Sequence, residues 1–162
     1  MPVLEWLTNT EYADWVRESW GWPLALTIHA FGTATVVGLI MIIGLRLFGL
    51  FRTIPFTALN SLFPAIWIAI VFQVLSGFTL WMTKPAQYLG AGMFLFKISF
   101  VIIGIITTIY FQATIKREAP AWEKTGIVSS RGVKFVTAAV LIWMAVNIAG
   151  RLTAYLTSLY VA

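Results

Sequence analysis

Residues 23–50 read PLALTIHAFGTATVVGLIMIIGLRLFGL, and this run decides the fold. No charged residue occurs between Pro23 and Arg46. At about 1.5 Å of rise per residue, a helix of this length crosses a hydrocarbon layer of about 30 Å. The one conspicuous interruption is His29, the single histidine of the chain, which helical rise places roughly 9–10 Å below the nearer surface. The stretch therefore predicts a membrane-spanning helix with a functional group near one end.

The composition of the whole chain points to the same class. Hydrophobic residues make up 60% of the 162 residues and charged residues 10%, which is too apolar for a soluble domain. The net charge of +5 comes from basic residues in short loops beside the spans, where such residues set orientation, so a nucleic-acid partner is not expected. The absence of cysteine excludes thiolate metal sites, iron–sulfur clusters and covalently attached haem.

The hydropathy pattern predicts one all-α transmembrane domain over residues 1–162. Short connections between successive spans favour an antiparallel four-helix transmembrane bundle. Residues 3–20 fit a short amphipathic helix lying at the interface, which could break near Asn9. Residues 116–131 form the longest polar connection. The expected spans are residues 23–50, 59–82, 90–115 and 133–160.

Loop charges predict the orientation of this bundle. The first connection contains Arg46 and Arg52, and the third contains five basic residues, whereas the second contains only Lys84. Basic loops stay in the cytoplasm. Both termini are then expected outside the cytoplasm.

This topology places five strongly polar residues in the outer half of the bundle. By helical rise they lie at depths of roughly 8–18 Å. Lys97 is one heptad from both Gly90 and Gly104, so we expect space beside the lysine for something other than a side chain. The candidate binding residues are His29, Gln73, Lys97, Asn147 and Arg151.

The two cations of this set need a counter-charge, because an unpaired cation in lipid costs several kcal/mol. All six acidic residues lie outside the expected spans. The partner could be Glu18 or Asp14 of the N-terminal helix, a lipid phosphate, or a bound anionic ligand. A porphyrin with two propionates beside a histidine would satisfy the whole set.

Each residue also has a purely structural interpretation. A lone histidine, asparagine or glutamine in a span often bonds a neighbouring helix. A lysine can extend its amine to the surface, and Arg151, near the end of the chain, can anchor the interface. Their location at one level of four helices favours a shared site.

The first span resembles that of a group of uncharacterised bacterial four-helix membrane proteins, with an early His, spaced small residues and a closing Leu-Arg-Leu-x-Gly. The likeness continues through FLFKISFV, which contains Lys97. The chain is more distantly similar to the copper-resistance D type proteins and to HemJ-type protoporphyrinogen oxidases. In the HemJ type, the histidine and lysine are associated with haem or porphyrin, but this chain lacks the further histidines and the Pro-Arg motif, so oxidase activity is not implied. The matching residues are His29, Gly32, Gly38, Leu45, Arg46, Leu47 and Gly49.

The resemblance implies location in the bacterial inner membrane. We predict a non-enzymatic protein that binds a b-type haem near the outer face, with a possible role in electron transfer. His29 would ligate the iron, Lys97 and Arg151 would receive the propionates, and Gln73 and Asn147 would add hydrogen bonds. The alternatives are a cofactor-free accessory subunit and a site for a lipid, quinone or small anion. Small residues along the first span, and the single histidine, also predict a homo-oligomer or a subunit of a larger complex.

Overall fold

The protein is all-helical in a computed structural model that describes residues 2–159, with side chains described for residues 3–153. Four of its helices are long and apolar enough to cross a membrane, which confirms the predicted helical class and is compatible with a membrane protein. The elements are α1 (Pro2–Thr8), α2 (Glu11–Glu18), α3 (Gly21–Leu47), the 3₁₀ helix η1 (Thr57–Leu62), α4 (Phe63–Met82), α5 (Pro85–Gly90), α6 (Gly92–Thr125) and α7 (Ser130–Leu159).

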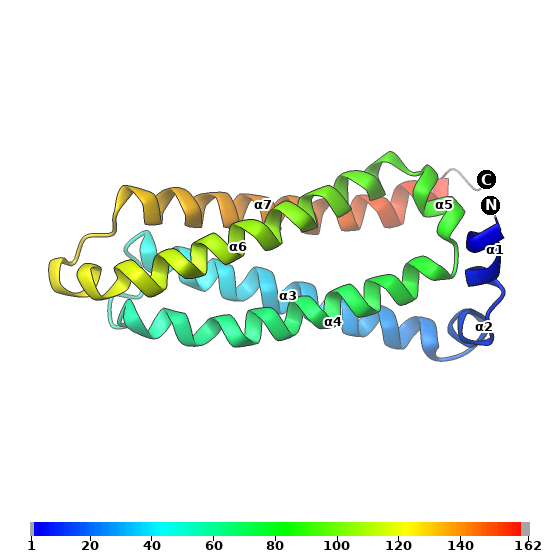
Figure 1. The fold of residues 1–162 in the computed structure, drawn as a ribbon, viewed down its shortest axis with the longest axis horizontal. Coiled ribbons are helices and arrows are strands. Elements are labelled where there is room, and N and C mark those ends of the chain that lie inside the picture. Colours follow the sequence, from blue (N-terminus) through cyan, green and yellow to red (C-terminus); the bar gives the residue numbers. More distant parts are fainter. Residues whose placement is uncertain (1, 160–162) are drawn as a thin grey trace.

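The four long helices lie side by side, and the chain reverses direction between each helix and the next (Figure 1). α3 packs on α4 and α6 packs on α7, and α3 also contacts α7. We call these pairs the α3/α4 and α6/α7 hairpins. The helices α1, α2 and α5 lie together at one end of the bundle, the α5 end, and the connection between α6 and α7 lies at the other, the turn end (Figure 1).

The N-terminal segment forms two short helices rather than one, with the break at Asn9 and Thr10. The hydroxyl of Thr10 accepts a hydrogen bond from the backbone of Ala13 and so caps α2. α2 buries Ala13 and Val16, one helical turn apart, against the bundle. Its Arg17 donates to the backbone carbonyl of Thr83 at the end of α4. These contacts attach α2 to the α5 end.

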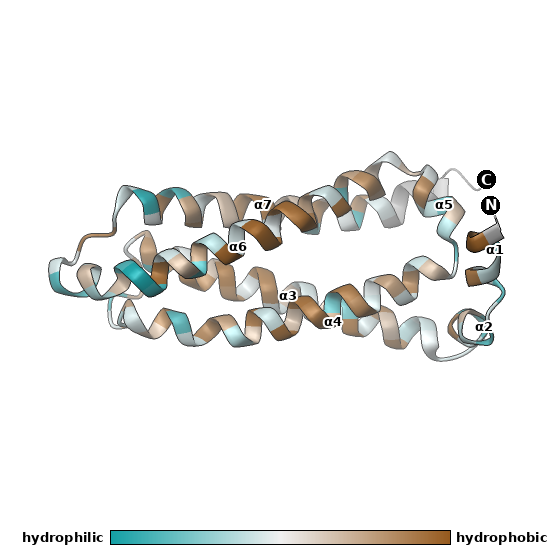
Figure 2. Cartoon of the chain, viewed as in Figure 1, coloured by the Kyte–Doolittle hydropathy of each residue, from teal (hydrophilic) through white to brown (hydrophobic). Residues whose placement is uncertain are grey.

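α6 extends about ten residues beyond the span expected to end at residue 115, so most of the predicted polar connection is helical. Figure 2 shows hydrophilic residues gathered on this last part of α6 and on the start of α7. The helix ends at Gly126, whose φ of +69° is readily available only to glycine. Packing explains the extension, because Trp122 is buried and its ring lies edge-on to Phe56 at 6.0 Å.

The Leu-Arg-Leu-x-Gly sequence at the end of α3 is a helix stop. The backbone N–H of Leu50 bonds the carbonyl of Leu45, and Gly49 adopts a φ of +99°, which together make a Schellman motif. Arg46 is buried, donates to the backbone carbonyl of Ile54, and stacks over the ring of Phe56 at 3.7 Å. The motif therefore holds the connection between α3 and η1.

The described hydrophobic core lies toward the turn end. It is built from the second halves of α3 and α6 and the first halves of α4 and α7, and η1 contributes Leu59 to it. Phe63 of α4 meets Phe111 of α6 edge-on at 5.8 Å, and Trp67 donates to Gln112 at 2.9 Å. α4 and α6 meet there and separate toward the α5 end (Figure 1). The tight half of the bundle thus supports a more open half, which contains the candidate site.

Candidate functional site

His29 is held by α4 in a defined orientation. Its Nδ1 lies 3.0 Å from the backbone carbonyl oxygen of Gln73 and 3.2 Å from the hydroxyl of Ser76. A carbonyl oxygen only accepts, so Nδ1 carries the proton and donates. The Ser76 hydroxyl is itself 2.6 Å from the carbonyl of Phe72, to which it donates. The hydrogen atom of the neutral imidazole is therefore on Nδ1, and Nε2 is left as a hydrogen-bond acceptor.

Two glycines let the helices come close enough for these bonds. A Cβ placed on Gly32 would lie 3.1 Å from the backbone oxygen of Ala69, and one placed on Gly77 would lie 3.1 Å from Cε1 of His29. These distances are tighter than ordinary packing, so α3 and α4 approach through small residues, as helices do in membranes. The imidazole lies against Gly77 as a result.

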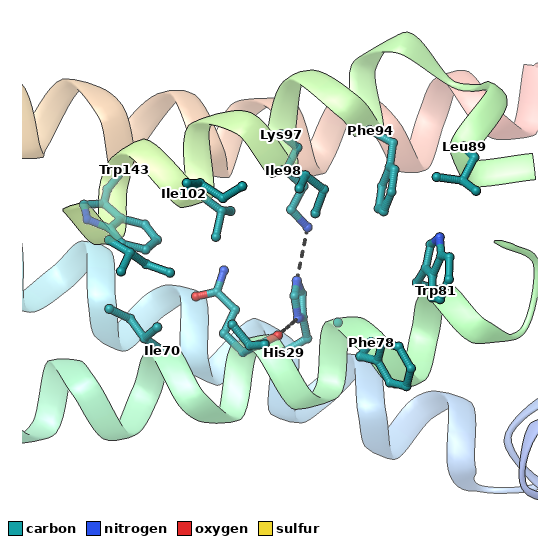
Figure 3. A pocket seen from close by; sticks show the side chains of 15 residues that line it. His29, Ile70, Phe78, Trp81, Leu89, Phe94, Lys97, Ile98, Ile102 and Trp143 are labelled. Carbon is teal, nitrogen blue, oxygen red and sulfur yellow. Dashed lines mark hydrogen bonds between the residues drawn. The ribbon is translucent and has the colours of Figure 1, made fainter. Parts of the chain in front are cut away.

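Lys97 reaches His29 from the opposite hairpin. Its Nζ lies 3.2 Å from Nε2 of His29, and the two side chains span the space between the hairpins in Figure 3. The ammonium donates and the unprotonated Nε2 accepts. Within residues 3–153, no carboxylate lies at salt-bridge distance from Lys97.

The glycine that lies beside Lys97 is Gly150 of α7, where a Cβ would lie 3.5 Å from Nζ of the lysine, at ordinary van der Waals distance. The two glycines expected from the sequence do not lie against the lysine. Gly90 belongs to α5, a separate helix, and a Cβ on Gly104 would lie 3.1 Å from the ring of Trp143. The heptad argument failed because the helix breaks at Ala91 and an aromatic ring fills the room at Gly104.

Gln73 carries an unsatisfied polar atom. Its side chain is 6% exposed, and its Oε1 is buried without a hydrogen-bond partner among the described residues. An unpaired buried carbonyl of this kind costs about 1–3 kcal/mol. The site therefore has one buried acceptor, Oε1 of Gln73, to which no described group donates a hydrogen bond.

Two cavities meet at these three residues. We call the first, of about 450 Å³, the α4/α6 groove, and the second, of about 430 Å³, the α3/α7 pocket. Both contain His29, Gln73 and Lys97 in their walls. The rest of the groove is lined by apolar residues of α4, α5, α6 and α7, namely Ile70, Val74, Gly77, Phe78, Trp81, Leu89, Phe94, Ile98, Val101, Ile102, Ile105 and Trp143.

The α3/α7 pocket contains the remaining two predicted residues. Asn147 and Arg151 border it from α7, and both are exposed. The structure thus brings all five predicted residues to one region, but only His29, Gln73 and Lys97 form a directly bonded cluster. Ser76 and Gly150 contribute contacts that the sequence prediction missed. Ser76 lies three residues from Gln73 on one helical face, and this spacing was a usable signal.

No protein-family model, curated protein or solved structure matches this chain. The likeness to four-helix bacterial membrane proteins therefore rests on the motif residues alone. Among the described residues, no group of three His, Asp or Glu side chains lies close enough to hold a metal ion.

Proposed function

We propose that this chain is an integral protein of the bacterial inner membrane. Its four membrane-spanning segments would be α3, then η1 together with α4, then α6, and then α7. The proposal rests on four helices of suitable length and hydropathy. Basic residues gather near the turn end, at Arg52, Lys116, Arg117, Lys124, Arg131 and Lys134, and such clusters favour the cytoplasmic face. The α5 end, with α1 and α2 on the interface, would then face outward.

We propose further that the protein binds a b-type haem through His29. The observation that supports this proposal most directly is the hydrogen bond from Nδ1–H of His29 to the backbone carbonyl of Gln73. Ligating histidines are commonly oriented in this way, because the bond fixes the tautomer and leaves Nε2 free to ligate. In the described cluster, Nε2 is the atom that would bind iron, and both cavities lie beside it.

The α3/α7 pocket supplies partners for the haem propionates. Its volume of about 430 Å³ lies within the range of about 300–1,000 Å³ common for small-molecule sites. Arg151 and Lys97 offer cationic donors there, and Asn147 offers an amide. The bound group would supply electron-transfer chemistry, and the protein would supply the axial ligand and the burial that set its potential.

These residues fit a haem on one condition, which is that Lys97 leaves Nε2 of His29. The 3.2 Å bond between the two side chains favours a second candidate function, a cofactor-free membrane subunit in which the pair only joins the hairpins. The lysine ammonium sits on a flexible four-carbon chain, so it can turn away from His29 and reach a propionate instead.

Spectroscopy separates the two functions. The purified protein, supplemented with hemin, should show a Soret band that shifts on reduction. His29→Ala should lose this band while remaining in the membrane, and Lys97→Ala and Arg151→Ala should retain less haem than the natural chain. Arg131→Ala, a basic residue at the turn end, serves as the control and should bind haem normally. Equal haem content in the natural chain and His29→Ala would overturn the proposal.

We also propose that the protein is a homo-oligomer, either alone or within a larger complex. One chain offers one imidazole, so the sixth position of the iron would be empty, filled by a weak ligand such as Met93 or Met144, or supplied by another subunit. A two-fold axis normal to the membrane would place two His29 residues at one depth. Gly38 supports contact through α3, because a Cβ there would meet nothing within 4 Å of its own chain.

A further inference from the structure

The acidic residues of the turn end have hydrogen-bond partners inside the protein. Oε2 of Glu123 accepts from the backbone N–H of Phe56 at 2.6 Å. The carboxylate of Glu118 accepts from the hydroxyl of Ser129 and from the guanidinium of Arg117. Among the residues with described side chains, Arg117 is the only basic residue of this end in an ion pair. The other cations of the turn end are therefore left without a carboxylate at ion-pair distance.

Two of these cations line a cavity of about 580 Å³ on the surface at the start of α7. We call it the Arg131 pocket, and its lining residues are Ser130, Arg131, Lys134, Phe135 and Ala138. These residues follow one another at helical spacings of three or four, so they form one face of α7. Along this face two cations come first, then an aromatic ring, and then a small residue toward the middle of the bundle.

The ring of Phe135 forms a fixed floor for the Arg131 pocket. The guanidinium of Arg131 lies 5.7 Å from the centroid of this ring, a distance typical of cation–π contacts. The ring of Tyr110 on α6 stacks on Phe135, with 6.3 Å between the centroids and 14° between the planes. Both Arg131 and Lys134 are exposed. Glu118 attracts Arg131 only from beyond ion-pair distance, so both cations can receive an anion from outside the chain.

The pocket lies at the level of lipid head groups if α7 spans the membrane as proposed above. No charged residue follows Lys134 until Arg151, which corresponds to a helical rise of about 26 Å. This is most of a hydrocarbon layer of about 30 Å, so Lys134 is placed at its edge. Ala138 and Leu141 continue the same face inward, and Leu141 is 64% exposed. The cations thus meet the head-group layer, and the apolar part of the face meets acyl chains.

This order of chemical groups matches a phospholipid, in which a phosphodiester stands directly above the acyl chains. The planar guanidinium of arginine presents paired N–H donors that fit phosphate oxygens, and lysine adds a point charge. A zwitterionic head brings its own ammonium close to these cations and so loses part of the attraction. Basic clusters beside membrane spans accordingly favour anionic lipids.

We propose that the Arg131 pocket binds the head of an anionic phospholipid. The phosphodiester accepts hydrogen bonds from Arg131 and Lys134, and one acyl chain lies over Phe135 and Ala138. The inference rests on the proposed membrane location. It does not require the haem, because the pocket lies at the turn end and Arg151 borders the α3/α7 pocket near the other end of α7.

The test is native mass spectrometry of the full-length protein released from nanodiscs that contain equal amounts of dioleoylphosphatidylglycerol and dioleoylphosphatidylethanolamine. The two lipids share their acyl chains and the phosphodiester, and only the ethanolamine head carries an ammonium. The natural chain should retain phosphatidylglycerol at least tenfold more often than phosphatidylethanolamine. The double variant Arg131→Gln with Lys134→Gln should lose this preference. Equal retention of the two lipids by the natural chain would overturn the proposal.

Two matched comparisons test the location of the lipid. Arg52→Gln with Lys124→Gln removes the same charge from exposed positions of the turn end outside the pocket, and should keep the preference. Ala138→Trp should fill the floor of the pocket and lower retention of phosphatidylglycerol at least tenfold. Ala145 is also partly buried and lies one heptad further along α7, outside the pocket, so Ala145→Trp should leave retention unchanged. Equal effects in either comparison would overturn the assignment to the Arg131 pocket.

Two further measurements separate this site from the proposed function. Release of the natural chain from membranes by alkaline carbonate would reject the membrane location and the lipid site together. A chain that resists extraction but retains both lipids equally would reject the lipid site alone. The double variant Arg131→Gln with Lys134→Gln should still give a Soret band with hemin, and loss of this band would overturn the independence of the two sites.

Discussion

Nζ of Lys97 lies 3.2 Å from Nε2 of His29, and this bond joins the two hairpins where α4 and α6 have separated. The lysine contributes a charge that no carboxylate neutralises within residues 3–153. The imidazole is therefore its specific acceptor. Removing His29 and removing Lys97 should therefore change the stability of the protein by different amounts.

His29→Leu should destabilise the protein more than Lys97→Met. Loss of His29 leaves a partly buried ammonium without its acceptor, at a cost of about 1–3 kcal/mol. Loss of Lys97 removes the charge while methionine keeps most of the stem beside Gly150. The measurement is thermal unfolding in mild detergent, without haem. The double variant should recover part of the loss, and strictly additive effects of the two substitutions would contradict a direct interaction.

Gly104→Leu and Gly38→Leu should fail in different ways. A side chain at Gly104 meets the ring of Trp143, so the fold itself should lose about 1–3 kcal/mol or more. A Cβ at Gly38 meets nothing of its own chain within 4 Å, so Gly38→Leu should fold normally and lose oligomerisation. Detergent-corrected mass and thermal unfolding, measured on both variants, separate the effects. A natural chain with the mass of a single subunit in both detergent and nanodiscs would reject the oligomer.

Arg46→Lys should weaken the turn after α3. Lysine keeps the charge but loses the planar stack over Phe56 and the directed bond to Ile54, at a cost of about 1–2 kcal/mol. Arg52→Lys is the control, because Arg52 is exposed. Thermal unfolding should show a lower midpoint for the first variant only, and equal midpoints would show that the stack contributes nothing measurable.

Thr108→Val should destabilise the middle of the bundle. The hydroxyl of Thr108 accepts the indole N–H of Trp143 at 3.0 Å, and valine would leave this buried donor unpaired, at a cost of about 1–3 kcal/mol. Thr114→Val provides the matched comparison. Thr114 is also buried on α6, but its hydroxyl bonds only the carbonyl of Tyr110 in its own helix. Similar unfolding midpoints for the two variants would argue against a role for the Trp143 bond.

Reporter fusions test the orientation. A reporter inserted at Gly126, where the turn is open, should be active in the cytoplasm, and one fused after the C-terminal residue should be active outside. The C-terminal residue lies beyond the described residues, so the C-terminal fusion tests only on which side of the membrane the chain ends. The reverse pattern would place the polar cluster near the inner face and remove the outward-facing site.

The sequence by itself determined the helical class and the common level of the polar residues along the bundle. Long apolar runs predict helices, and a helix has a fixed rise per residue. Because successive helices run in opposite directions, this rise places His29, Gln73, Lys97 and Asn147 at one level. The sequence also allowed for a break near Asn9, and the structure places this break at Asn9 and Thr10, where the Thr10 hydroxyl caps α2. The sequence placed the end of the third span at residue 115, where charges begin, because hydropathy detects the apolar part of a helix and not its polar continuation to Thr125.

Only the tertiary structure decided which residues meet. Hydropathy gives no rotation about the helix axis, so it could not show that His29 faces Gln73 and Lys97, while Asn147 and Arg151 remain exposed at a pocket rim. Nor could it assign the glycines, because Gly150 lies beside Lys97, whereas Gly104 packs closely against the ring of Trp143. These relations depend on the packing of α4, α6 and α7 against one another. Because α4 and α6 meet near Phe63 and separate beyond Trp67, the groove exists only in the folded bundle.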